Sequence, residues 1–255
     1  MTNQDPSCSE TEDEKVNALW ADQDYILNNI DHADRDFIAK HPGCSEVEHQ
    51  IGRYLNMKSA IRDIEDHGIS GDVIEFGTWQ GLSLILLGRA FVNSKTPRKF
   101  IGIDSFEGLP ETSTVWEKGQ FDNTSFDLAH KNISEKISKD QRFSLIKGWF
   151  NDKSVANRLR QESDDVVLVH FDADLGSSTT QALEIVEYYV KKSQHPMFFL
   201  FDDWGCHPDE VPDAFYDWLG TASGRYQIKA EKLSSTRYTR YYKIIPRCMN
   251  ILKIF

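Results

Sequence analysis

Cysteine is scarce in this 255-residue chain, and its spacing argues against two common ways of stabilising a fold. The cysteines lie far apart and form no C-x-x-C pair: Cys8, Cys44, Cys206 and Cys248. Zinc sites built from cysteine pairs and disulfide frameworks both rely on regular, close spacing. We therefore expect free thiols in a reducing compartment.

The chain also has no excess of positive charge and no long apolar run, and we expect no leader sequence. Its net charge of −11 argues against a broad basic surface for nucleic acid or anionic lipid. Residues 1–15 are polar and acidic, unlike a signal peptide. No apolar run approaches the length, about 20 residues, that spans a bilayer. We expect a cytoplasmic protein that binds neither nucleic acid nor a membrane.

What the chain does have is a regular alternation of strand-like and helical segments. Residues 1–15 read as a disordered tail and residues 16–67 as an N-terminal helical cap. From residue 68 to residue 255 the alternation predicts an α/β domain: a Rossmann-like, doubly wound sheet of seven strands, mostly parallel. The last two strand-like runs, 226–233 and 238–245, predict an antiparallel C-terminal hairpin.

Two apolar runs of this domain end in clusters of acids. Residues 166–171 run into Asp172 and Asp174, and residues 197–201 run into Asp202 and Asp203. Such runs fit strands that are buried on both faces of a parallel sheet. Ligands of open α/β sheets bind outside the carboxyl ends of the strands, so these acids can converge on one crevice. Converging carboxylates need a compensating charge, and Mg²⁺ is the simplest one.

A glycine-containing turn follows the first strand of the domain. Its sequence, Glu75-Phe76-Gly77-Thr78-Trp79-Gln80-Gly81, has neither the spacing of a dinucleotide fingerprint nor that of a P-loop. It does match the E/D-x-G-x-x-x-G loop of S-adenosylmethionine-dependent methyltransferases. The loop alone fits a structural glycine turn about as well.

The ends of the next two strands strengthen the methyltransferase interpretation. Asp104 follows the second strand and could accept both ribose hydroxyls of a nucleoside, although it also fits a turn aspartate. Trp149 and Phe150 follow the third strand and could enclose an adenine, although either one also fits the core. Residues 107–125 show little regular pattern and predict a long functional loop.

Five segments together resemble the macrocin O-methyltransferase family, whose members are metal-dependent enzymes that methylate sugar hydroxyls of natural products. They are IEFGTWQG (74–81), DSFEGLP (104–110), KGWFND (147–152), DADL with the later ST (172–179) and DDWG (202–205). The resemblance runs from about Tyr54 to Leu219. It implies a class I methyltransferase domain, with S-adenosyl-L-methionine as the methyl donor.

The resemblance also implies roles for individual residues. Three acids would hold Mg²⁺ or a similar cation: Asp172, Asp202 and Asp203. Five residues would line the methionine end of the cofactor: Glu75, Gly77, Thr78, Trp79 and Gly81. Asp104 and Ser105 would meet the ribose, and Trp149 and Phe150 the adenine.

A catalytic hypothesis follows from this metal site. Two vicinal hydroxyls of a small-molecule acceptor would chelate the cation, which lowers the pKa of the reacting hydroxyl. A base would then take its proton, and the candidates are His170, Asp172, Asp174 and His207. We assign the catalytic role to Asp172 and His170.

Alternatives to a sugar acceptor stay open at this point. A catechol or another vicinal diol would use the same metal chemistry, in a slot formed by Trp116, Phe121 and Phe126. A cofactor-binding protein without catalysis is a further alternative, and an NAD-dependent oxidoreductase ranks last because the glycine spacing is wrong. The N-terminal helices either cover the acceptor site or mediate formation of a homo-oligomer.

Overall fold

Seven strands form one sheet in the order β3-β2-β1-β4-β5-β7-β6. The structure, a computed structural model, describes residues 11–205 and 210–246. The strands are β1 (Asp72–Phe76), β2 (Lys99–Asp104), β3 (Arg142–Lys147), β4 (Val166–Phe171), β5 (Met197–Phe201), β6 (Lys229–Ser235) and β7 (Arg240–Ile245). Strands β1 to β5 run parallel, whereas β7 pairs antiparallel with both β5 and β6. The predicted doubly wound sheet with its C-terminal hairpin is confirmed.

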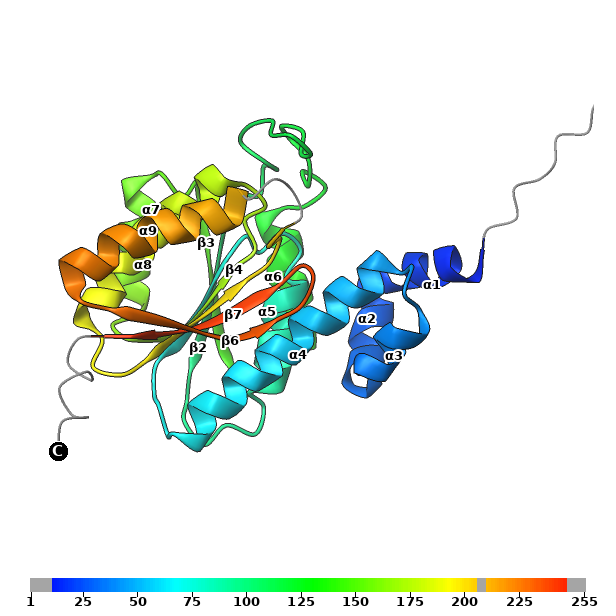
Figure 1. Ribbon diagram of the computed structural model, residues 1–255, viewed down its shortest axis with the longest axis horizontal. Helices are drawn as coiled ribbons and strands as arrows, with labels where there is room; N and C mark the ends of the chain where they lie inside the picture. Colours follow the sequence, from blue (N-terminus) through cyan, green and yellow to red (C-terminus); the bar gives the residue numbers. More distant parts are fainter. Residues whose placement is uncertain (1–10, 206–209, 247–255) are drawn as a thin grey trace, which may run out of the picture.

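Helices cover both faces of this sheet (Figure 1). They are α4 (Ser45–Asp66), α5 (Leu82–Ala90), α6 (Phe126–Lys136), α7 (Lys153–Glu162), α8 (Gly176–Lys192) and α9 (Glu210–Tyr226). Neighbouring strand residues point to opposite faces. Val73 and Leu168 accordingly pack in one apolar core with α4, α5 and α6, while Ile74 and Val169 pack in a second core with α7, α8 and α9. Every residue of β4 and β5 is therefore buried.

The chain enters the fold through a series of N-terminal helices. They are α1 (Glu12–Trp20), α2 (Gln23–Asn29), the 3-10 helix η1 (Ile30–His32), α3 (Arg35–Lys40) and α4 (Ser45–Asp66). Helix α1 begins inside the predicted disordered tail, so that prediction is wrong for residues 12–15. The reason is a capping box: Glu14 N donates to Thr11 Oγ1 (3.2 Å), and Thr11 N donates to Glu14 Oε2 (2.7 Å). Residues 1–10 lie outside the described part of the chain.

Helix α4 belongs to the layers of the sheet rather than to a separate cap. Its buried face shares one apolar core with β1, β4 and β5. Asn56 Nδ2 donates to Thr239 Oγ1 (2.5 Å), and Tyr241 Oη donates to Asp63 Oδ2 (2.6 Å). The predicted boundary between residues 67 and 68 therefore separates no independent cores. No helix in residues 11–205 or 210–246 is both long and apolar enough to cross a membrane.

Candidate active site

A cavity of about 610 Å³ lies at the carboxyl ends of β1 to β5. It includes the switch point between β1 and β4, where ligands of doubly wound sheets bind. Gln23 and Ile26 from α2 and residues of α4 line one side of it. The irregular segment 107–125, which contains no helix or strand, contributes Trp116 and Phe121.

The glycine turn brings the ends of β1 and β4 into close approach. Gly77 has φ +86°, and a Cβ atom there would lie 1.6 Å from the carbonyl oxygen of Asp172. Only glycine fits this position. Gly77, Thr78 and Trp79 line the cavity. Gly81 does not, because it caps α5 and faces α6, where its Cβ would meet Ile133 Cγ1 at 2.6 Å.

Asp104 is held in place by the backbone of two loops. Its Oδ2 accepts from Trp79 N (2.7 Å) and its Oδ1 accepts from Phe106 N (2.6 Å). Burial raises the pKa of Asp104, and the backbone hydrogen bonds offset that effect in part. Each carboxylate oxygen keeps a further lone pair for a ligand. Ser105 lines the cavity beside it.

Trp149 and Phe150 follow β3 and also line the cavity. The Phe150 ring meets the edge of Phe76, with ring centroids 5.2 Å apart. Seven of the nine residues predicted to bind the cofactor thus reach one side of a single cavity: Gly77, Thr78, Trp79, Asp104, Ser105, Trp149 and Phe150.

Glu75 and His170 lie behind the cavity wall, side by side on β1 and β4. Their side chains are buried, and His170 Nδ1 lies 3.0 Å from Glu75 Oε1. Burial would lower the pKa of His170, but the hydrogen bond to Glu75 and the nearby acids raise it. Among the described residues, neither Glu75 Oε2 nor His170 Nε2 has a hydrogen-bond partner. Neither residue lines the cavity, so both are placed to support the residues in front of them.

The acids after β4 and β5 converge, but they do not all face the same way. Asp172, Asp174 and Asp203 line the cavity. The Asp202 side chain is fully buried and points toward α4. Strand β5 ends at Phe201 and Asp203 has φ +54°, which breaks the strand alternation. Asp203 therefore faces the cavity, whereas Asp202 faces His49 and Arg53 and has an oxygen within 4.8 Å of a ligand atom of Asp172.

Two cations from α4 neutralise the back of this cluster. Arg53 Nη1 donates to Asp202 Oδ2 (2.8 Å) and to Asp172 Oδ2 (3.0 Å). His49 Nε2 lies 2.9 Å from Asp202 Oδ1. Sequence reasoning missed both residues. The available signal was their i, i+4 spacing on an amphipathic helix, which places them on the same face.

The pKa values of the four acids differ because these cations lie on one side only. Burial would raise the pKa of Asp202, but the charges of His49 and Arg53 hold it below its usual range. Burial and the Asp202 carboxylate raise the pKa of Asp172 to about 6. Burial and the neighbouring acids raise the pKa values of Asp174 and Asp203 well above normal. A further positive charge on the cavity side would therefore stabilise the ionised forms of these carboxylates.

Comparison with known proteins identifies the family. The sequence profile described as Macrocin-O-methyltransferase (TylF) matches residues 17–218. The chain belongs to this family. It is therefore an O-methyltransferase, and S-adenosylmethionine is its methyl donor. The sequence-based prediction of family and enzyme class is confirmed.

Two curated relatives and two solved structures show how far this O-methyltransferase has diverged. The 8-demethyl-8-(2,3-dimethoxy-alpha-L-rhamnosyl)-tetracenomycin-C 4'-O-methyltransferase of Streptomyces olivaceus is 23% identical over 220 residues, which cover 80% of this chain and 81% of the relative. The demethyldecarbamoylnovobiocin O-methyltransferase of Streptomyces niveus is 25% identical over 172 residues, 62% of each chain.

The structural neighbours share the fold of this O-methyltransferase. The calicheamicin methyltransferase CalS11 matches with a TM-score of 0.62 at 17% identity, over 97% of this chain and 99% of its own. The O-methyltransferase NovP matches with a TM-score of 0.60 at 20% identity, over 76% of this chain and 79% of its own. These neighbours support the Rossmann-like architecture.

Proposed function

We propose that this O-methyltransferase transfers the methyl group of S-adenosylmethionine to a hydroxyl of a sugar or glycosylated natural product, aided by a divalent cation. The observation that carries the proposal is the pairing of two sites in one cavity: Gly77 and Asp104 on one side, and the acids after β4 and β5 on the other. The relative whose name specifies a rhamnosyl group supports the acceptor class.

In this proposal the cofactor occupies the side of the cavity under β1, β2 and β3. Gly77, Thr78 and Trp79 would face its methionine end, because the turn leaves no side chain in the way at Gly77. Asp104 would accept hydrogen bonds from the ribose hydroxyls while its backbone donors hold it still. Trp149 and Phe150 would lie against the adenine. Aromatic faces near the sulfonium would also favour its positive charge.

The residues at the other side fit a hard divalent cation such as Mg²⁺. We propose Asp172, Asp202 and Asp203 as its ligands, because oxygen donors suit such ions and the carboxylates resist ionising together. Asp202 already accepts from Arg53 and His49, but a carboxylate oxygen can accept one hydrogen bond and still use a second lone pair. A bound cation would lower the pKa of an acceptor hydroxyl and fix its position.

The structure favours acids over histidine as the proton acceptor. His170 is held by Glu75 behind the cavity wall and does not reach an acceptor in this arrangement. Asp172 and Asp174 both line the cavity. We propose that Asp174 takes the proton, because it lines the cavity whereas Asp172 is tied to Arg53. His207, a further candidate, lies outside the described residues.

One observation favours a second acceptor class, a catechol or similar aromatic diol. Trp116 and Phe121 line the cavity with ring centroids 5.5 Å apart, and Phe121 also lies near Trp79. Such rings would hold a flat aromatic acceptor, and they would also hold the apolar face of a sugar or of its aglycone. Phe126 packs on Phe106 and does not line the cavity.

The decisive experiment is a methyl-transfer assay on a panel of rhamnosides, other glycosides and catechols. Each acceptor is incubated with enzyme and S-adenosylmethionine, with Mg²⁺ or with EDTA, and the products are analysed for a mass gain of one methyl group. We expect a glycoside product only with Mg²⁺. Product from catechols alone would replace the sugar assignment, and equal turnover in EDTA would refute the metal assignment.

A matched pair of variants separates the metal from general charge effects. Asp203→Asn removes a cavity-facing carboxylate and should abolish the response to Mg²⁺. Asp164→Asn changes an exposed acid on the segment before β4, at the opposite end of that strand, and should leave the response unchanged.

A further inference from the structure

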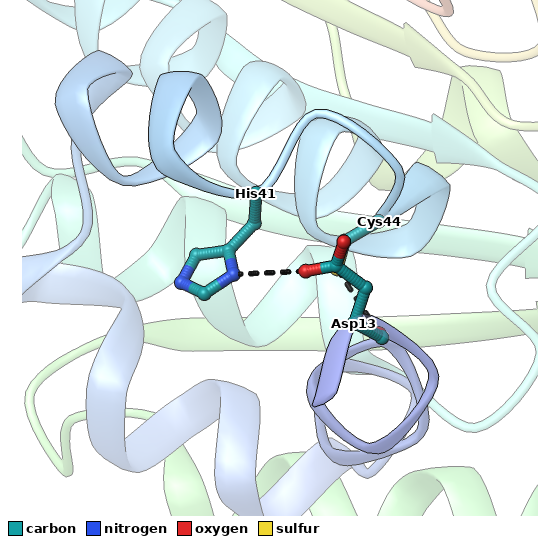
Figure 2. A group of neighbouring side chains, drawn as sticks. All are labelled: Asp13, His41 and Cys44. Atoms are coloured by element: carbon teal, nitrogen blue, oxygen red, sulfur yellow. Dashed lines mark hydrogen bonds and ion pairs between the residues drawn. The ribbon is translucent and has the colours of Figure 1, made fainter. Parts of the chain in front are cut away.

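A second group of metal-ligating side chains lies outside the active-site cavity, on the N-terminal helices. It consists of Asp13 on α1, and of His41 and Cys44 on the connection between α3 and α4. Figure 2 shows the Asp13 carboxylate facing the His41 ring and Cys44. None of the three lines the cavity, and the proposed methyl transfer uses none of them.

Two of the three separations between these atoms are close to those of a tetrahedral zinc site. One ligand atom from each residue lies within 4.8 Å of the other two. His41 Nδ1 lies 3.3 Å from Asp13 Oδ1, and Cys44 Sγ lies 3.8 Å from the same oxygen. Usual zinc bond lengths with tetrahedral angles require about 3.4 Å between nitrogen and oxygen and about 3.6 Å between sulfur and oxygen. Both separations differ from these values by only a few tenths of an ångström.

Hydrogen bonds alone account for the separations in this cluster less completely than a bound zinc ion does. The contact of His41 Nδ1 to Asp13 Oδ1, at 3.3 Å, is longer than the 2.7–2.9 Å typical of a charge-assisted N–H···O bond. The Cys44 sulfur lies 3.8 Å from the same oxygen, farther than from the Asp13 backbone oxygen. The Cys44 thiol donates to the Asp13 backbone oxygen at 3.1 Å, which satisfies the thiol but leaves the carboxylate between two weak partners. Burial and the Asp13 carboxylate raise the pKa of Cys44, so the thiol stays protonated unless a metal takes its place.

The surrounding helices are of the kind that a metal stabilises. Helix α3 has no buried residue, and Trp20 is the one buried residue of α1. Short helices with so little buried apolar surface are marginal on their own. A metal ion would connect α1 to the start of α4 across a long stretch of chain, the arrangement in which a cross-link restricts the unfolded chain most.

We propose that Asp13, His41 and Cys44 bind a zinc ion that fastens α1 to the α3–α4 connection. The ligand set of carboxylate, imidazole and thiolate suits zinc rather than Mg²⁺. Asp13 is about half exposed, so water would complete the coordination. The thiol proton leaves to solvent when the sulfur binds.

The test is a Co²⁺ titration of the full chain, reduced and freed of metal, because cobalt bound to a thiolate gives a charge-transfer absorption band. The acids of the active site have no sulfur and give no such band, so failure here is distinct from failure of the Mg²⁺ proposal. We expect a band that saturates at a single equivalent and disappears when Zn²⁺ is added. Absence of the band from the wild-type protein would overturn the proposal.

Variants assign the site to these residues. Cys44→Ser should lose the band, whereas Cys206→Ser should keep it. Because Cys44 is buried and its variant could fold poorly, His41→Gln provides a second test at a partly exposed side chain. With Mg²⁺ in excess to occupy the active-site acids, it should weaken cobalt binding at least tenfold and remove the further rise in melting temperature caused by Zn²⁺, with unchanged melting in EDTA. A band that survives in Cys44→Ser would contradict the assignment.

Discussion

Both sides of the active-site cavity contain buried carboxylates, but the groups that stabilise these carboxylates differ between the two sides. On the cofactor side, Asp104 is held by backbone N–H groups from its own turn and from the glycine loop. On the acid side, Asp172 and Asp202 are held by side chains from α4, more than 100 positions earlier in the chain. The donors to Asp104 belong to the cofactor-loop motifs themselves. The donors to Asp172 and Asp202 come near them only through the tertiary fold. This difference predicts which substitutions damage the whole fold and which damage mainly binding.

Arg53→Met is the substitution expected to cause the largest loss of unfolding free energy, through the acids on the acid side of the cavity. Removing a buried guanidinium leaves Asp172 and Asp202 without their shared cation, and breaking a buried pair costs about 3–5 kcal/mol. We expect urea unfolding of the metal-free protein to show a loss of this size. Arg62→Met, at an exposed position of the same helix, should cost less than about 0.5 kcal/mol.

A double variant tests the cause of that loss. Asp202→Asn combined with Arg53→Met removes a buried charge together with its partner, so part of the lost stability should return. If Arg53→Met is as stable as Arg62→Met, or if the double variant recovers nothing, Arg53 does not balance the acid cluster.

Gly77→Ala tests the point where the two sides meet. An alanine Cβ would collide with the carbonyl oxygen of Asp172 at a backbone angle of φ +86°, so β1 and β4 must move apart. Strain and overpacking together should cost about 2–4 kcal/mol. Gly220→Ala on α9, where a Cβ meets nothing within 4 Å, should be neutral or slightly stabilising in the same unfolding experiment. Equal stability of the two variants would refute the close approach.

Asp104→Asn should damage binding, with some loss of stability as well because the amide nitrogen cannot accept from one of the two backbone N–H donors. Asparagine keeps the shape of the side chain but loses the charge that would accept two ribose hydroxyls, and a hydrogen bond to a charged group contributes about 1.5–3 kcal/mol. We expect S-adenosylmethionine to bind about 10–100-fold more weakly by calorimetry. Asp122→Asn, an exposed acid of the neighbouring loop, serves as the control. Unchanged affinity in Asp104→Asn would remove the ribose assignment.

The same contrast explains what could be predicted from the sequence. The sheet was predictable because β4 and β5 are continuous apolar runs, and the cofactor side because Gly77 and Asp104 lie in short local motifs. The roles of Arg53 and His49 could not be predicted, because their partners lie in segments that only the folded sheet brings near α4. Gly81 belongs to the motif, yet in the structure it serves packing against Ile133.

The last effect is the pH dependence of His49. Burial alone would lower its pKa, but the Asp202 carboxylate and the hydrogen bond between them raise it to about 9. The ordinary value is 6.5, so the folded state holds this proton more tightly than the unfolded state. The stabilisation is therefore complete below pH 6.5 and is lost as the pH rises to about 9.

We expect the metal-free protein to lose about 3 kcal/mol of unfolding free energy over this interval, measured by urea unfolding in EDTA. His49→Gln should start less stable at pH 6 and show a flatter profile up to pH 9. His67→Gln, an exposed histidine just past the end of α4, should keep the wild-type slope. If all three proteins show the same slope, His49 is not a charged partner of Asp202, and Arg53 alone balances the acid side.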